Sequence, residues 1–115
     1  MHIDKDLVAA MATPLVLAIL VEGTSCGYAI FKRVRELSAG EVQWTDGMLY
    51  PLLHRLERLG YVETEWGDSP DGRRRRYYRI TEEGRAQLAD QRRQWETVTR
   101  TLGDLWRLPL SAAGA

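Results

Sequence analysis

The chain has 115 residues, 44% of them hydrophobic, and a formal net charge of zero. A chain of this length buries one modest core, which excludes an assembly of several independent domains. Neutrality argues against a general attraction to nucleic acid, but five of the seven basic residues between positions 41 and 80 are clustered at residues 73–79. A phosphate backbone responds to charge within a Debye length of about 8–10 Å, so the local cluster keeps nucleic acid among the expected partners.

The cysteine content and the hydropathy pattern indicate in which cellular compartment the chain is expected. Cys26 is the single cysteine, so an intramolecular disulfide is impossible and a reducing compartment, the cytoplasm, is expected. The most apolar run, residues 14–21, is shorter than the roughly 20 residues that cross a bilayer, and the opening MHIDKD lacks the pattern of a signal peptide. We therefore interpret the run as a core helix and expect no membrane partner.

The first predicted helix covers residues 4–22, with Asp4 as its N-cap and Gly23 at its end. Pro14 leaves two alternatives. Either one helix kinks there, or Thr13 caps a new helix that begins with the proline.

Two shorter helices are predicted next. Ser25 is the expected cap of the second, which ends at residues 38–40 and has apolar residues at helical spacing, namely Ile30, Phe31, Val34 and Leu37. Thr45 is the expected cap of the third, with Asp46 in its first turn and Gly60 at its end. Leucines occupy one side of this third helix, at positions 49, 52, 53, 56 and 59.

A hairpin follows the third helix. Residues 61–66 and 73–80 are the predicted strands, and the turn formers of residues 67–72 join them. Alternation along the second strand places Tyr78 and Ile80 on the core face.

The last predicted helix starts at Thr81 and ends at about Leu108, where Pro109 stops it, and residues 109–115 form a disordered tail. Its apolar residues follow a heptad seam, interrupted by the polar Gln91, at Leu88, Trp95, Val98, Leu102 and Leu105. The other elements already fill the core, so a second copy of the chain is the simplest partner for this seam.

This order of elements predicts a mainly helical α+β fold. Residues 1–80 form a winged helix-turn-helix, in which the first helix also contributes to the dimer interface, and residues 81–108 form a long C-terminal dimerisation helix. The outward side of the third helix suits a major groove, which is about 12 Å wide. The expected DNA contacts are Thr45, Gly47, Met48, Tyr50, Pro51, His54, Arg55 and Arg58 of the third helix, Tyr28 and Lys32 of the second, and Arg73, Arg74 and Arg75 of the hairpin.

Plainer interpretations compete with this one. The third helix can be an ordinary amphipathic helix, and the arginine run can be a basic edge strand that blocks aggregation, with Arg76 covering the sheet by its aliphatic stem. A winged helix used for protein–protein contact, with the arginines facing an acidic partner, is the alternative function.

Trp95 has two interpretations of equal weight. It is a core residue of paired helices, or it borders a gap between them that accepts a flat aromatic effector. The expected lining of that gap is Met11, Pro14, Gln91, Trp95 and Thr99. Trp106 is interpreted as ordinary packing.

Catalysis and metal binding have little support. His2 and His54 lack companion ligands, Cys26 fits a small buried residue, and no nucleophile–base pair or glycine-rich phosphate loop is present. We expect no enzyme activity, cofactor or metal.

Several short motifs together resemble the PadR family of regulators: Gly27-Tyr28, Gly47 with Leu49-Tyr50-Pro51, Arg55-Leu56-Glu57 with Gly60, and Tyr77-Tyr78-Arg79-Ile80-Thr81 with Gly84. The resemblance implies a winged-helix dimer formed through the C-terminal helix, acting as a bacterial repressor on a pseudo-palindromic operator. It is closest to the short multidrug-sensing members, in which a tryptophan from each chain lines a pocket at the dimer interface. Met48 departs from the family's usual hydroxyl residue, and Gln91, Arg92 and Thr99 make the expected pocket more polar.

Overall fold

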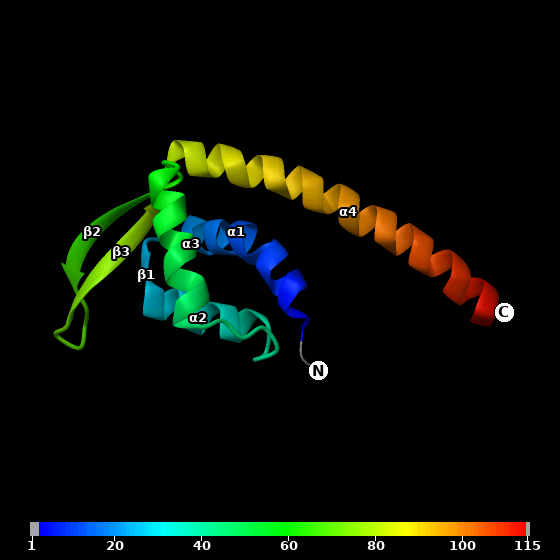
Figure 1. Cartoon of the computed structure of the whole chain (residues 1–115), viewed down its shortest axis with the longest axis horizontal. Coiled ribbons are helices and arrows are strands. Elements are labelled where there is room, and N and C mark those ends of the chain that lie inside the picture. Colours follow the sequence, from blue (N-terminus) through cyan, green and yellow to red (C-terminus); the bar gives the residue numbers. More distant parts are fainter. Residues whose placement is uncertain (1–2, 115) are drawn as a thin grey trace.

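Three short helices and a small sheet form one body, and a single long helix extends from it (Figure 1). The computed structural model describes residues 3–114, with side chains described as far as residue 107. In chain order the elements are α1 (Lys5–Glu22), β1 (Ser25–Cys26), α2 (Gly27–Leu37), α3 (Asp46–Arg58), β2 (Val62–Asp68), β3 (Arg74–Ile80) and α4 (Glu82–Gly114). This arrangement confirms the predicted mainly helical winged helix with a long C-terminal helix.

The sheet has three antiparallel strands in the order β1-β3-β2. The hairpin register pairs Val62 with Ile80 at the base and Asp68 with Arg74 at the tip. On the other edge of β3, Ser25 pairs with Tyr78. The prediction that Ser25 caps the second helix is therefore wrong, because a sheet partner about fifty residues away recruits it, and Cys26 takes the N-cap position.

The core lies between the three short helices and the inner face of the hairpin. Its fully buried side chains are Val16, Leu17, Ile30, Val34, Leu49, Leu53, Leu56 and Val62. Tyr78 and Ile80 are also buried, as the alternation predicted, at 2% and 6% exposure. Leu59, placed on the inner side of the third helix by the sequence pattern, is 50% exposed because it lies at the C-cap, where the helix has ended.

α1 is one continuous helix with Pro14 inside it, which decides between the two alternatives. Asp4 is its N-cap and accepts a hydrogen bond from the Asp6 amide, as expected. A proline within a helix costs about 3 kcal/mol. The burial of Val16 and Leu17 directly after it offsets that cost.

The hydroxyl of Thr81 joins the end of α3 to the start of α4. It donates to the Gly60 carbonyl at 2.6 Å and accepts from the Gly84 amide at 3.0 Å, so it caps α4. Gly84 lies directly against the Tyr61 carbonyl oxygen, where an added Cβ would overlap. The root of α4 is thereby fixed to the body.

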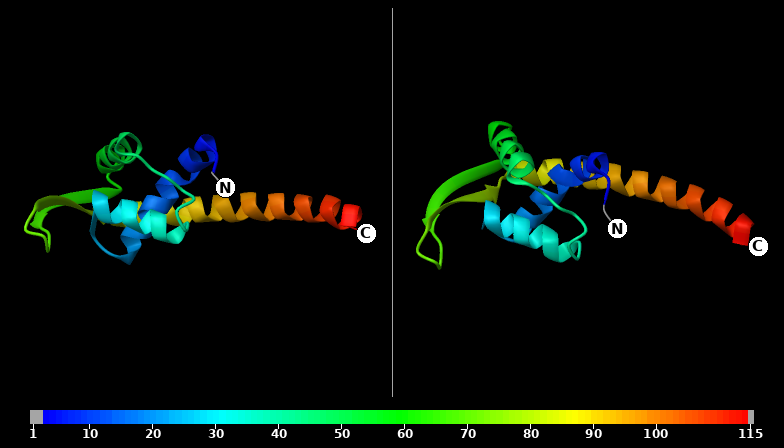
Figure 2. Two further views of the ribbon diagram at one scale, coloured as in Figure 1. Left: turned by 90° about the horizontal axis from the view of Figure 1, so that it is seen from below. Right: turned by 60° about the horizontal axis from the view of Figure 1, so that its bottom comes forward.

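Beyond its root, α4 leaves the body entirely. All three views show its C-terminal half without neighbours (Figures 1 and 2). The helix passes Pro109 and ends at Gly114, so the predicted helix end near Leu108 is wrong, while the predicted disorder of the tail stays a prediction. The physical reason is that a proline removes one hydrogen bond without forbidding the helix, as α1 already demonstrates; Ala115 lies outside the described residues. Within residues 3–114, no helix is long and apolar enough to span a bilayer.

Candidate nucleic-acid interface

α3 separates its residues cleanly into a buried and an exposed side. Leu49 and Leu53 are 0% exposed and Leu56 is 1% exposed, which anchors the helix on the core. The side chains at Pro51, His54, Arg55 and Arg58 are exposed. These four positions, spaced three or four residues apart along one side of the helix, are called here the outer face of α3.

The outer face carries positive charge that no other described side chain neutralises in an ion pair. Among the described side chains, Arg55 and Arg58 have no ion-pair partner, and neither has Lys32 on the exposed side of α2. Arg33, only one position from Lys32, is by contrast held by Glu22 in two hydrogen bonds of 2.8 Å. Uncompensated cations on one surface favour an anionic partner.

Arg76 fastens the hairpin to α3. Its guanidinium donates to Glu57 of α3 at 3.0 Å and to the Thr64 hydroxyl at 2.8 Å, and the Thr64 hydroxyl itself donates to Glu57 at 3.0 Å. This arginine therefore serves the fold, and its role goes beyond the predicted covering of the sheet.

Arg75 is also engaged within the protein. It pairs with Asp71 at 3.0 Å, and its guanidinium lies over the ring of Tyr28 at 5.5 Å. Asp71 accepts further hydrogen bonds from the Ser69 hydroxyl and the Arg73 amide. The Ser69 hydroxyl, then the Arg73 amide and the Arg75 guanidinium, hold the pKa of the Asp71 carboxyl well below its usual range. Of the three hairpin arginines predicted to contact DNA, Arg75 is thus the least available.

Arg73 and Arg74 are the hairpin cations that face solvent. Both are exposed, and Arg73 has no ion-pair partner among the described side chains. The guanidinium of Arg74 stacks over the indole of Trp66, 5.8 Å from the ring centroid. The hairpin tip and the outer face of α3 are the two basic surfaces of the body.

Tyr50 and Gly27 set the packing of α3 on α2, a role that the sequence pattern did not reveal. A Cβ on Gly27 would lie 2.6 Å from the Tyr50 hydroxyl oxygen, so only glycine leaves room for this ring. Tyr50 also meets Phe31 edge to face at 6.4 Å and keeps 37% of its surface exposed. The motifs Gly27-Tyr28 and Leu49-Tyr50-Pro51 were the one available signal of this contact.

Met48 is partly buried beside the outer face, and its predicted DNA contact stays a prediction. Its side chain packs against the core and lines a hollow of about 520 Å³ with Ile3 and Val8 of the N-terminal region. The four-residue spacing from Met48 to Leu52 and Leu56 places the three side chains on adjoining parts of one side of the helix. Thr45 is the N-cap of α3, as predicted, and like Gly47 it is exposed.

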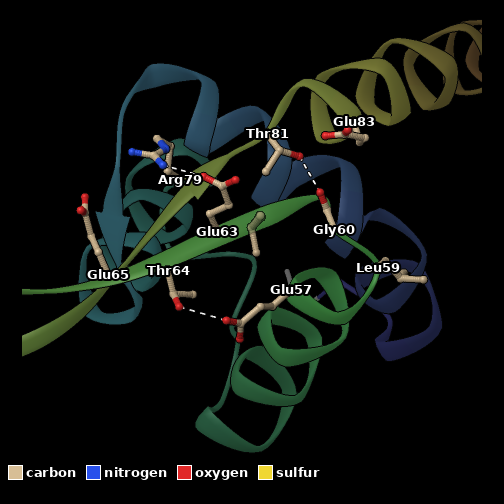
Figure 3. Close-up of a pocket in the computed structure, with 10 residues that line it drawn as sticks. Glu57, Leu59, Gly60, Glu63, Thr64, Glu65, Arg79, Thr81 and Glu83 are labelled. Carbon is tan, nitrogen blue, oxygen red and sulfur yellow. Dashed lines mark hydrogen bonds and ion pairs between the residues drawn. The ribbon is translucent and has the colours of Figure 1, made fainter.

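An acidic hollow of about 730 Å³ follows the free edge of β2 (Figure 3). Glutamates from three elements border it, at positions 57, 63, 65 and 83, and Glu63 pairs with Arg79 at 2.5 Å. Charged side chains on an exposed edge strand discourage pairing with other chains. Negative charge here also repels DNA, which leaves the outer face of α3 and the hairpin tip as the surface for a polyanion.

The distal part of α4, residues 92–107, exposes apolar side chains. Val98 is 46%, Leu102 38% and Leu105 60% exposed, whereas Leu88 is buried in the core of its own chain. The seam open to a partner therefore begins at Trp95 and not at Leu88, because the root of α4 is already packed on the body.

The residues expected to line an effector pocket are open to solvent to different degrees in the single chain. They are Met11, Pro14, Gln91 and Trp95, all partly exposed, and Thr99, which is exposed. The Thr99 hydroxyl donates to the Trp95 carbonyl at 2.9 Å, so it is committed to the helix backbone. α1 and α4 pack against each other and supply one wall of the expected gap.

No cluster of metal-ligating side chains occurs among residues 3–107, and His2 lies outside the described residues. Cys26 is a buried free thiol, as expected.

A three-helix body with a basic hairpin and an exposed third helix defines the winged-helix class of DNA-binding proteins. The model of the PadR-like transcriptional regulator family matches residues 16–90, and the chain belongs to this family. The chain is 46% identical to the transcriptional regulator Rv3488 of Mycobacterium tuberculosis over 66 residues, which cover 57% of this chain and 61% of that protein.

Solved structures support the same conclusion. A transcriptional regulator from Clostridium thermocellum superposes with a TM-score of 0.79 and 30% identity, covering 87% of this chain and 97% of that one. A PadR family regulator from Eggerthella lenta gives a TM-score of 0.75 and 32% identity, covering 87% and 85% of the two chains. The protein is thus a DNA-binding transcriptional regulator, like the relatives named above.

Proposed function

We propose that the protein is a homodimeric repressor that binds a pseudo-palindromic operator and is released by a small aromatic or drug-like effector at the dimer interface. The observation that carries this proposal is the outer face of α3, where Arg55 and Arg58 are exposed and have no ion-pair partner among the described side chains. As a regulator of transcription, it acts in the cytoplasm.

The dimer is supported by the exposed seam of Trp95, Val98, Leu102 and Leu105 on distal α4. Full burial of a leucine-sized side chain contributes roughly 1.5–3 kcal/mol, so the seam gains substantially from a second copy. A two-fold pair presents two α3 helices to one duplex, and half-sites about 34 Å apart then match successive major grooves.

The effector proposal rests on Trp95 and its neighbourhood. In a pair, Trp95 with Met11 and Pro14 borders the space between the two copies, while Gln91 and Thr99 add polar groups. An effector in this space changes the angle between the protomers, and the α3 helices then lose register with the grooves.

The test is a titration of the protein with the duplex upstream of its own gene at salt concentrations from about 50 to 200 mM. Binding weakens linearly on a log–log plot, with a slope of about −0.9 for each phosphate contacted. A duplex of equal length and shuffled sequence is the control. Absence of binding at about 50 mM salt, or a flat plot, contradicts DNA binding as the mode of action.

Effector release is tested on the same complex. An aromatic dye that binds near Trp95 quenches tryptophan fluorescence and dissociates the operator. The Trp95→Ala variant, compared at concentrations where it is dimeric, still binds the operator but no longer responds to the dye. A dye response that is unchanged in the variant contradicts the proposed pocket.

A further inference from the structure

Trp66 is an exposed indole on the hairpin without a packing role. It keeps 59% of its surface exposed, although tryptophan is normally well buried. Its contact with Arg74 is the one ring contact that the described structure gives it, and no hydrogen bond joins its Nε1–H to another described residue. The side chain is therefore free to serve a partner.

The register of the hairpin places Trp66 on the same side as α3. Residues directly opposite each other share a face, so Trp66 shares one with Arg76, and alternation adds Thr64 and Arg74. Thr64 and Arg76 contact Glu57 of α3, which shows that this face looks toward α3. Trp66 lies two residues beyond Thr64, roughly 7 Å farther toward the tip, past the edge of α3.

The pair of Trp66 and Arg74 has the chemistry of a nucleic-acid contact. The indole offers a flat apolar surface and one N–H donor, and the guanidinium offers charge and a planar array of donors. The cation–π contact at 5.8 Å favours guanidinium orientations over the ring and so reduces the rotamer freedom that Arg74 would lose on binding.

We propose that Trp66 and Arg74 form a single DNA-contacting unit of the hairpin. The indole lies against a deoxyribose of the strand that flanks the α3 contact, and Arg74 binds the adjoining phosphate. Trp66 thus contributes directly and also positions Arg74. This inference rests on the proposed binding of duplex DNA and assigns the hairpin contact to a residue outside the arginine run.

The experiment measures operator affinity and its salt dependence for Trp66→Ala, Trp66→Phe, Arg74→Ala, Arg74→Lys and the double variant Trp66→Ala/Arg74→Ala. Trp66→Ala weakens binding about fivefold, the size of one exposed stacking contact, and Trp66→Phe recovers part of the loss. Arg74→Ala lowers the magnitude of the salt slope by about 0.9, whereas Arg74→Lys keeps the slope and still loses affinity because lysine does not stack. The double variant loses less than the product of the two single losses.

The matched control is Glu65→Gln, which changes the neighbouring strand position on the opposite face of the hairpin and alters affinity less than twofold. Thermal unfolding of Trp66→Ala is unchanged, because the indole is exposed. If the wild-type protein binds the operator and Trp66→Ala binds it within twofold of the same affinity, the inference is overturned. If the loss in the double variant equals the product of the two single losses, Trp66 and Arg74 do not act as one unit. If the wild-type protein itself fails to bind any duplex, the proposed function fails and this inference with it.

Discussion

α3 and the distal part of α4 are both amphipathic helices, but they differ in what covers their apolar side. The leucines of α3 at positions 49, 53 and 56 are at most 1% exposed, because α1, α2 and the hairpin surround them. Leu102 and Leu105 on α4 are 38% and 60% exposed, with nothing from the described chain above them. The same spacing completes a core on α3 and leaves an exposed apolar side on distal α4, which the proposed second copy of the chain would cover.

Breaking the α4 seam gives the largest expected effect. In Leu102→Asp, a buried carboxylate without a partner opposes dimerisation, so the dimer dissociation constant rises at least about 100-fold and operator binding falls with it. Sedimentation velocity measures the change. Arg100→Asp, on the outward side of the same helix, is the control and leaves the dimer intact. A Leu102→Asp protein that sediments like wild type would show that the seam is not the interface.

The outer face of α3 gives the next largest effect. Replacing His54 and Arg58 by alanine removes base and phosphate contacts, and each base contact is worth about 1–3 kcal/mol of discrimination. The ratio of operator to shuffled-duplex affinity falls about 10- to 100-fold, measured by competition. An unchanged ratio favours the alternative function, a winged helix that binds an acidic protein partner.

A glycine-to-alanine substitution at two positions of α4 compares the root of the helix, which packs on the body, with its exposed distal part. In Gly84→Ala the new methyl group overlaps the Tyr61 carbonyl and lies 2.8 Å from Ile80 Cγ1, which destabilises the body by about 1–3 kcal/mol. In Gly103→Ala the nearest atom is Arg107 Nη2 at 3.9 Å, so the helix gains about 0.8–1 kcal/mol of propensity. Thermal unfolding separates the two, and equal shifts of the same sign would contradict the described packing.

The smallest expected effect concerns Tyr78, which is buried in the core of the body. Burial raises the pKa of the Tyr78 hydroxyl, so the folded chain holds its proton more tightly than the unfolded chain. Stability is complete below the unfolded pKa of about 10 and falls as pH rises above it. The Tyr78→Phe variant lacks this contribution to the loss of stability at alkaline pH. Urea unfolding at a series of pH values detects the difference in the free energy of unfolding. An identical pH profile in the variant would contradict the burial effect.

The helices and the hairpin were predictable because their periodicities are local. Asp4 and Gly60 mark helix boundaries by short-range chemistry, Thr45 occupies the N-cap position without a side-chain cap bond, and alternation along β3 correctly places Tyr78 and Ile80 inside. β1 was not predictable, since two residues form no pattern and Ser25 becomes a strand residue only when β3 lies beside it.

The candidate interface was predicted less completely. The exposed side of α3 followed from helical spacing, but the partial burial of Met48 against Ile3 and Val8 did not, because those neighbours come from the N-terminal region. The arginine run also looked uniform along the sequence. Its division into inner and outer members depends on Glu57 and Asp71, whose proximity is a property of the folded chain. Whether these residues touch DNA stays a prediction.

The bonds from Arg76 to Glu57 and from Arg75 to Asp71 have a thermodynamic consequence for an encounter with DNA. A hairpin tied to its neighbouring helix and to α2 arrives with its shape already fixed. Little backbone freedom is then lost on docking, and such loss is one of the main terms that oppose association. Calorimetry on a Glu57→Ala protein would register this as a less favourable binding entropy, even where every atom that meets the duplex is unchanged.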